Sequence, residues 1–293
     1  MTASTLGLIG LIGLGNMGLP VAARLVAQGR TVRVWDASPA QRDRAVASGS
    51  VAADSAMQVA KECTLIVLSL PTPSVVRTVM ADLLKHIPTG RIVIDLSPTD
   101  PGTAQEMAAA AAAHGVAYID SPVSGGPSRA ATGELTLMVG GDEAAVQSVR
   151  PLLAQIGKQV EYVGPAGCGC IAKLLNNYVA LWGMIGVSQA FLAASALNIS
   201  TDRLYDVMSR SSGQSYSLSR NFPKIRSGDF SPNFSLTLAE KDLRLALQLM
   251  NDAGLTSFAE KDVRALFETS AHERGDKDVA AIYQTLAAMT TPR

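Results

Sequence analysis

A glycine-rich turn near the start of the chain is the feature that most constrains the fold. Gly13-Leu14-Gly15-Asn16-Met17-Gly18 follows a short apolar run and precedes a helical pattern that carries Pro20 near its start. In such a turn the first glycine permits a tight bend, the second lets a ligand approach the backbone, and the third lets the helix pack closely on the strand. Free N–H groups at the start of the helix bind phosphate. The pattern therefore predicts a strand–turn–helix unit that holds a dinucleotide.

An acidic residue stands where such a unit needs one. Asp36 follows the second predicted strand, and its carboxylate can accept hydrogen bonds from ribose hydroxyls and would repel a 2′-phosphate. We therefore expect NAD as the cofactor, in preference to NADP. Arg42 lies close in sequence and keeps NADP open. The alternative that needs no cofactor is a plain glycine turn with Asp36 as a capping residue.

Up to about Gly164, short apolar runs alternate with longer amphipathic segments. This rhythm is typical of a largely parallel sheet covered by helices on both faces. The predicted strands are Leu8–Gly13, Thr31–Trp35, Leu65–Leu68, Ile92–Asp95, Ala117–Asp120, Leu135–Val139 and Val160–Val163. The predicted helices between them include Pro20–Gln28, Ala40–Ser48, Ser74–Leu84 and Gln105–Ala113.

After Gly164 the strand signals stop and helical patterns take over. These are Ile171–Leu197, Thr201–Arg210, Leu236–Ala253, Ser257–Glu273 and Asp278–Ala288, whereas the polar stretch Ser211–Asn233 is interpreted as a loop with room for one short helix. We therefore expect a dinucleotide-binding domain over residues 1–164 and an all-α domain over residues 165–293, with a long interdomain helix at about 168–197.

Composition and charge exclude several classes of protein. Acidic and basic residues balance at 25 each, so the basic excess typical of nucleic-acid binding is missing. The long apolar pattern is interrupted by Lys173, two Asn and Gln189, which favours a helix buried in protein over a membrane span. The start of the chain lacks a signal-peptide pattern, so we expect a cytoplasmic protein. Cys168 and Cys170 have no second Cys/His pair at ligand spacing, so we expect no metal site.

A second motif, Asp120-Ser121-Pro122-Val123-Ser124-Gly125-Gly126, follows a predicted strand. Ligands of open parallel sheets sit beyond the carboxyl ends of the strands. The hydroxyl of Ser124 and the unhindered N–H groups of Gly125 and Gly126 suit a carboxylate or a phosphate. An ordinary turn explains the motif equally well.

A third motif surrounds Lys173, which lies among apolar residues of the predicted long helix. Asn177 follows four residues later and shares its helix face. Burial lowers the pKa of an ammonium group towards working pH, which suits a general acid/base. The alternative is a lysine that extends from the edge of the helix to water. His86, His114 and His272 are poorly placed for a histidine-based dehydrogenase.

Together these motifs resemble the β-hydroxyacid dehydrogenase family, which includes 3-hydroxyisobutyrate dehydrogenase and tartronate semialdehyde reductase and is related to 6-phosphogluconate dehydrogenase. The resemblance covers nearly the whole chain and rests on Gly13–Gly18, Leu70-Pro71, Asp95-Leu96-Ser97, Asp120–Gly126, Gly167–Asn177 and Lys241-Asp242-Leu243. It implies an α/β Rossmann-type N-terminal domain, an all-α C-terminal domain joined to it by a long helix, and a homodimer or homotetramer.

The resemblance also implies roles for individual residues. Lys173 would be the general acid/base, and Asn177 would orient the substrate or the lysine. The substrate carboxylate would be bound by Ser124, Gly125 and Gly126. Further cofactor contacts would come from Leu70, Pro71, Ser97 and Lys241. Taken without the resemblance, Lys241-Asp242 is an ordinary charge pair on a helix surface.

The implied activity is that of an NAD-dependent oxidoreductase that interconverts a small 3-hydroxy acid and its semialdehyde or keto form. Substrates of the 3-hydroxyisobutyrate or the glycerate/tartronate semialdehyde type fit best, and a sulfonated three-carbon or threonate-type substrate is an alternative. Arg129 either meets a second anionic group of the substrate or is solvated on a turn. A non-catalytic NAD-binding sensor is the rival from another class, and the presence of Lys173, Ser124 and Asn177 counts against it.

Overall fold

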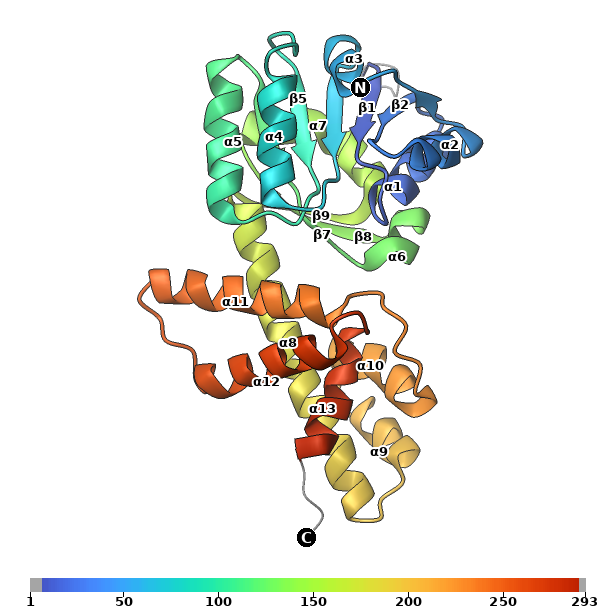
Figure 1. The fold of residues 1–293 in the computed structure, drawn as a ribbon, viewed down its shortest axis with the longest axis vertical. Coiled ribbons are helices and arrows are strands. Elements are labelled where there is room, and N and C mark those ends of the chain that lie inside the picture. Colours follow the sequence, from blue (N-terminus) through green and yellow to red (C-terminus); the bar gives the residue numbers. More distant parts are fainter. Residues whose placement is uncertain (1–6, 290–293) are drawn as a thin grey trace. The chain divides into compact units, whose positions relative to one another are not determined.

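The computed structural model of the protein describes residues 7–289. The chain forms two compact units, which divide after Lys173 inside the long helix α8, Cys168–Ala196 (Figure 1). The first unit is α/β and the second is all-α, which confirms the predicted fold class. The exact domain boundary expected at residue 164 stays a prediction.

The first unit is built on a nine-stranded sheet with the order β3-β2-β1-β4-β5-β6-β8-β7, in which β9 pairs with β8. The strands are β1 Ile9–Ile12, β2 Val32–Trp35, β3 Val51–Ala52, β4 Leu65–Leu68, β5 Ile92–Asp95, β6 Ala117–Asp120, β7 Val123–Ser124, β8 Leu135–Gly140 and β9 Gly157–Gly164. All pairs from β3 to β6 are parallel, whereas β8 runs antiparallel to β6 and β7. The two strands that the sequence patterns did not predict, β3 and β7, have two residues each.

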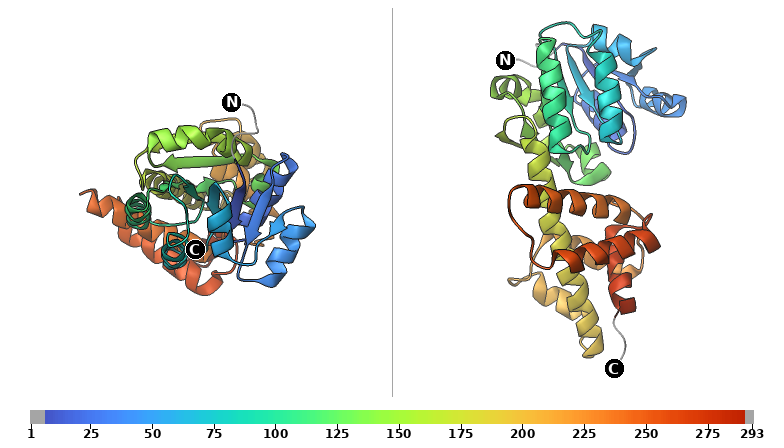
Figure 2. Two further views of the ribbon diagram at one scale, coloured as in Figure 1. Left: turned by 90° about the horizontal axis from the view of Figure 1, so that it is seen from above. Right: turned by 60° about the vertical axis from the view of Figure 1, so that its left-hand side comes forward.

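Helices cover both faces of this sheet because its strands are apolar on both sides. In β4, Leu65 and Val67 belong to one buried cluster and Ile66 and Leu68 to another. The helices are α1 Gly18–Ala27, α2 Pro39–Ala47, α3 Ala56–Glu62, α4 Pro73–Leu83, α5 Pro101–Ala113, α6 Gly126–Thr132 and α7 Glu143–Ile156. Helices α3, α4 and α5 pack on one face, and α1 and α7 on the other. Figure 1 and the right-hand view of Figure 2 show α4 and α5 side by side.

The second unit consists of helices. Beyond the start of α8 these are α9 Thr201–Met208, α10 Tyr216–Ser227, α11 Leu236–Asp252, α12 Glu260–Arg274, the 3-10 helix η2 Val279–Ala281 and α13 Ile282–Met289. Among the described helices, only α8 is long and apolar enough to cross a membrane, a test that core helices of water-soluble proteins also pass.

Helix α10 lies in the stretch Ser211–Asn233, for which the sequence predicts a loop with room for one short helix. It has twelve residues, so the expectation underestimated its length. Ser215 caps its start by accepting the N–H of Leu218, and Leu218 and Phe222 are buried one turn apart. The polar composition of this segment and the presence of Pro223 make its apolar face hard to predict from the sequence. Tertiary packing, which local sequence signals do not report, makes this segment helical.

A buried carboxylate organises the second unit. Asp278 is fully buried, and its Oδ2 accepts hydrogen bonds from Arg220 Nη2 at 3.0 Å and from the N–H of Asn233 at 3.0 Å. Its Oδ1 accepts the N–H of Ala280 at 3.1 Å. The carboxylate therefore joins α10, the loop before α11 and η2.

Replacing Asp278 by Ala should destabilise the second unit by about 3–5 kcal/mol, because the change leaves a partly buried guanidinium and three backbone N–H groups without their acceptor. Urea unfolding, followed by circular dichroism, measures this loss. Asp276→Ala is the control, since Asp276 is exposed and should shift stability by no more than about 0.5 kcal/mol. Equal unfolding midpoints for the two variants would contradict the assigned role of Asp278.

Candidate active site

The predicted cofactor residues of the first unit gather at one edge of its sheet. Gly13 follows β1, Asp36 follows β2, Leu70 follows β4 and Ser97 follows β5. Because these strands are parallel neighbours, their carboxyl ends meet at this edge. Ligands of open α/β sheets bind at such an edge, at the point where the strand order reverses. In this sheet that point lies between β1 and β4.

The three glycines of the turn differ in what the fold demands of them. Gly13 has a φ of +93°, and a Cβ there would collide with the carbonyl oxygen of Ser69. A Cβ on Gly18 would collide with the carbonyl oxygen of Gly13. A Cβ on Gly15, in contrast, would meet nothing within 4 Å. The outer glycines thus satisfy packing, and the middle one leaves the backbone open to a ligand.

The start of α1 has no side-chain cap, since Met17 precedes it and makes no such hydrogen bond. Beside it lies a groove of about 430 Å³. The groove is lined by residues of the glycine turn, α1, α2 and α6, namely Gly15, Asn16, Leu19, Pro20, Ala23, Arg44, Pro127 and Ala131. Open backbone and uncapped N–H groups fit the pyrophosphate of a dinucleotide.

Asp36 braces the glycine turn. Its Oδ2 accepts the N–H of Leu14 at 2.6 Å, and its Oδ1 accepts the N–H of Ser38 at 2.8 Å. Arg42 Nη1 donates to the backbone carbonyl of Asp36 at 2.6 Å. The carboxylate is therefore held next to the turn, at the end of β2, where an acidic residue meets the ribose in dinucleotide-binding folds.

A buried network lies behind the loops that follow β4 and β5. Ser97 Oγ accepts the N–H of Leu70 at 2.8 Å, and the N–H of Ser97 donates to Asp95 Oδ1 at 2.9 Å. The hydroxyl of Tyr118 donates to Asp95 Oδ2 at 2.6 Å. Burial raises the pKa of the Asp95 carboxyl above its usual value, although these hydrogen bonds oppose the rise. Ser97 is 1% exposed, so its hydroxyl fixes the loop of Leu70 and Pro71 from the interior.

The Ser-Gly-Gly loop forms the next part of this edge. Ser124 ends β7, and Gly125 and Gly126, with φ of +131° and +75°, lead into α6. All three residues are partly exposed. A Cβ on Gly125 would lie 2.9 Å from Cδ of Arg129, so the stem of that side chain packs on the loop. The loop can therefore offer a hydroxyl and backbone N–H groups to an anion.

Lys173 is half-buried and lies in the second turn of α8. The start of this helix is fixed by Asp120, the last residue of β6. Asp120 Oδ1 accepts the N–H of Gly167 at 2.8 Å, and Oδ2 accepts the N–H of Cys170 at 3.0 Å. The Ser-Gly-Gly loop begins just after the same Asp120, so the structure attaches both motifs to one strand end.

The two remaining predicted residues, Asn177 and Lys241, belong to the second unit. Asn177 Nδ2 donates to Asp242 Oδ2 at 2.7 Å, and Lys241 Nζ lies 3.0 Å from Asp242 Oδ1. Asp242 is 7% exposed, so the pair is not the ordinary surface charge pair that the sequence alone favoured. The structure brings Asn177 and Lys241 together through this carboxylate.

Three carboxylates that hold the site together lie within the sequence motifs, although the sequence indicates no role for them: Asp95, Asp120 and Asp242. The sequence feature that could have identified them is their position, since Asp95 and Asp120 end apolar strands and Asp242 follows Lys241. Among residues 7–289, no group of three or more His, Cys, Asp or Glu is placed to hold a metal ion.

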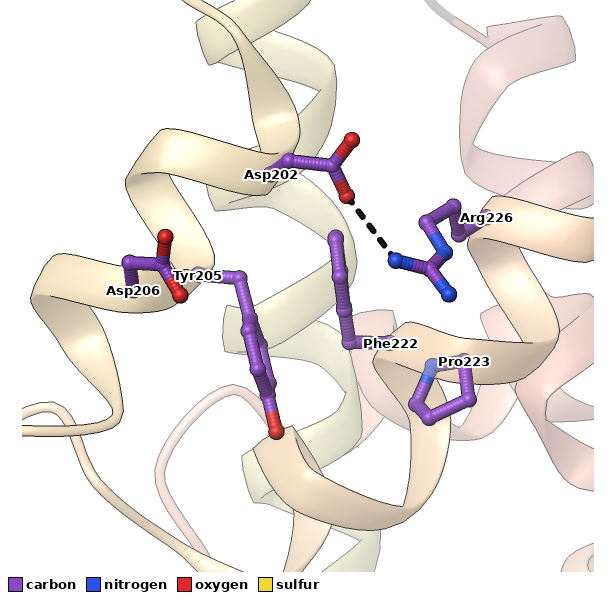
Figure 3. A pocket seen from close by; sticks show the side chains of 6 residues that line it. All are labelled: Asp202, Tyr205, Asp206, Phe222, Pro223 and Arg226. Carbon is purple, nitrogen blue, oxygen red and sulfur yellow. Dashed lines mark hydrogen bonds and ion pairs between the residues drawn. The ribbon is translucent and has the colours of Figure 1, made fainter.

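A second hollow, of about 360 Å³, lies between α9 and α10 and contains none of the predicted site residues (Figure 3). Tyr205 and Phe222 stack there with ring centroids 4.2 Å apart, and Arg226 Nη1 lies 3.4 Å from Asp202 Oδ1.

Comparison with known proteins identifies the family. A model described as the NAD binding domain of 6-phosphogluconate dehydrogenase matches residues 8–164. A second model, described as NAD-binding of NADP-dependent 3-hydroxyisobutyrate dehydrogenase, matches residues 167–286. The two matches together cover both units.

Relatives agree with these matches. A probable 3-hydroxyisobutyrate dehydrogenase of Mycobacterium tuberculosis is 34% identical over 287 residues, which are 96% of this chain and 98% of that protein. The 2-(hydroxymethyl)glutarate dehydrogenase of Eubacterium barkeri is also 34% identical over 287 residues, which are 96% of this chain and 95% of that protein. The solved structure of the M. tuberculosis 3-hydroxyisobutyrate dehydrogenase with L-serine has a TM-score of 0.89 at 34% identity and covers 96% of this chain and 99% of that one. The chain belongs to the β-hydroxyacid dehydrogenase family of NAD(P)-binding oxidoreductases.

Proposed function

We propose that the protein is an NAD-dependent dehydrogenase of a small 3-hydroxy acid, with Lys173 as general acid/base and Ser124, Gly125 and Gly126 as the carboxylate site. The observation that carries this proposal is that the helix of Lys173 and the Ser-Gly-Gly loop are fixed to the same end of β6. The compounds named with the relatives support it, since 3-hydroxyisobutyrate, 2-(hydroxymethyl)glutarate and the L-serine of the solved structure each carry a primary alcohol on the carbon β to a carboxylate.

Oxidation of such an alcohol removes a hydride and a proton. Bound NAD supplies the hydride acceptor. The neutral amine of Lys173 takes the hydroxyl proton, and its ammonium form returns that proton in the reverse reaction. The loop after β7 holds the substrate carboxylate and so fixes which carbon faces the cofactor. Asn177 orients the substrate or the lysine, and Lys241 contributes to binding of cofactor and substrate.

Turnover with a panel of acids tests this function. The panel contains 3-hydroxyisobutyrate, L-serine, glycerate, threonate, 2-(hydroxymethyl)glutarate and 2,3-dihydroxypropanesulfonate, and NADH formation is measured at alkaline pH, where a lysine base is most active. We expect one carboxylic acid to give the highest kcat/KM. Lys173→Ala should lower it by about 10²–10⁴-fold while NAD affinity is unchanged, since the change removes the proton acceptor.

Lys158→Ala serves as the matched control, because Lys158 is exposed on β9 and should not affect turnover. A best rate with the sulfonate would move the substrate class to sulfonated three-carbon compounds. Tight NAD binding without turnover of any panel acid would support the non-catalytic sensor instead.

The cofactor preference for NAD rests on Asp36, whose carboxylate is fixed beside the glycine turn by Leu14 and Ser38. Fixed negative charge at this position disfavours a 2′-phosphate. Arg42, the residue that kept NADP open, already donates to the backbone of Asp36.

Wild-type protein should therefore bind NAD at least about 10-fold more tightly than NADP, as measured by calorimetry. Asp36→Asn removes the repulsive charge, so we expect the ratio of the two Kd values to approach one. Asp43→Asn is the control, since Asp43 is exposed on the neighbouring helix α2. An unchanged ratio in Asp36→Asn would show that another group sets the preference.

We further propose that the protein is a cytoplasmic homo-oligomer in which the partner copy covers an exposed apolar stripe of α8. Leu175 is 40% exposed and Val179, one turn later, is 69% exposed. Adjacent exposed apolar side chains on a helix are typical of interfaces. All three cysteines are free, which suits a reducing compartment.

Light scattering during size-exclusion chromatography tests the assembly. The wild-type mass should be a multiple of the chain mass of 30.6 kDa. Val179→Glu should shift the protein towards the single-chain mass, because burying the new carboxylate at the interface is costly. Val46→Glu, at a site that is 47% exposed on α2, should leave the mass unchanged. A single-chain mass for the wild type would overturn the proposal.

A further inference from the structure

The first turn of α8 is capped by a residue that is distant in sequence. The residue before the helix, Gly167, has a φ of +92° and no side chain with which to cap it. The carboxylate of Asp120 takes over this task by accepting the N–H groups of Gly167 and Cys170. Cys170 is the third residue of the helix, whose N–H is one of those that an N-cap side chain usually accepts.

Four other helices of the first unit are capped by a side chain that is local in sequence. Ser55, Thr72, Asp100 and Asp142 each accept the N–H of the residue three positions later, at the starts of α3, α4, α5 and α7. A local cap stabilises its helix wherever the helix lies. The cap by Asp120 also ties the start of α8 to the end of β6, because acceptor and donors belong to different elements.

Close packing at the same point leaves little space for the helix to move. A Cβ on Gly140 would lie 2.6 Å from Asp120 Oδ1 and 2.8 Å from the N atom of Gly169. A Cβ on Gly169 would collide with the carbonyl oxygen of Met138. The first turn of α8 therefore lies directly on the backbone of β6 and β8, held there by hydrogen bonds that water cannot replace, since Asp120 is fully buried.

We propose that Asp120 is a positioning residue for the reaction, because it fixes Lys173 relative to the carboxylate-binding loop that starts from the same strand end. Lys173 lies three residues after Cys170, the second donor to the carboxylate. A displacement of about 1 Å at a reacting group can cost a factor of about 100 in rate. This inference rests on the proposed function of Lys173, and the experiment below separates the two.

The variant Asp120→Asn keeps one acceptor oxygen and places an NH₂ group against the other backbone N–H. We expect amide hydrogen exchange over residues 167–174 to become at least about 10-fold faster, because one capping hydrogen bond is lost. With the best acid of the panel, kcat should fall by about 10–100-fold, while KM and the Kd for NAD change less than about two-fold. Asp142→Asn is the matched control, because it makes the same substitution at the local cap of α7 and should leave kcat and exchange in α8 unchanged.

A double-mutant cycle distinguishes positioning from a general loss of structure. If Asp120 acts through Lys173, Asp120→Asn has no further effect on the residual kcat of Lys173→Ala. An equal fractional loss in both backgrounds would mean that the substitution only lowers the amount of folded protein, which overturns the proposal.

The remaining outcomes are also decisive. Wild-type kcat in Lys173→Ala would overturn both the acid/base assignment and the positioning role. An inactive Lys173→Ala together with wild-type kcat and unchanged exchange in Asp120→Asn would overturn the positioning role alone.

Discussion

Two hydrogen bonds from the start of α8 to the carboxylate of Asp120 hold together the candidate site of the first unit. A buried carboxyl group is costly unless its oxygens accept hydrogen bonds. Two backbone donors and the positive end of a long helix meet that requirement. In return, the start of the helix that carries Lys173 is hydrogen-bonded to the strand end from which the Ser-Gly-Gly loop starts. Catalytic groups gain from such support when their partners are built on regular elements rather than on free loops.

The same device recurs in this protein. Asp95 joins β5 to Tyr118 on β6, Asp242 joins Asn177 to Lys241, and Asp278 joins three segments of the second unit. Each carboxylate is buried and is shared by donors from different segments. A chain with a charged fraction of only 17% thus uses several of its acidic residues internally, as fixed acceptors that define relative positions.

Local signals were sufficient for the outline of the fold. The glycine turn, the strand that precedes it and the alternation of strands and helices are encoded within short windows, so β1 and α1 were predicted nearly as observed. For the stretch that contains α10 these local signals indicate only a loop with room for one short helix, because the apolar face of α10 is buried by tertiary contacts such as the stacking of Phe222 on Tyr205. The role of Asp120 could not be predicted either, because its donors lie almost fifty positions away and spacing carries no information about that contact.

The three glycines of the turn differ in the space around them, so they should differ in which substitutions the fold accepts. Gly13 and Gly18 are required by the backbone that surrounds them, whereas nothing in the protein lies near the missing side chain of Gly15. A library selected for soluble expression would accept substitutions at Gly15 and reject them at the other two. A library selected for turnover would reject all three. Comparing the two selections would therefore show, for each glycine of this hexapeptide, whether folding or catalysis requires it.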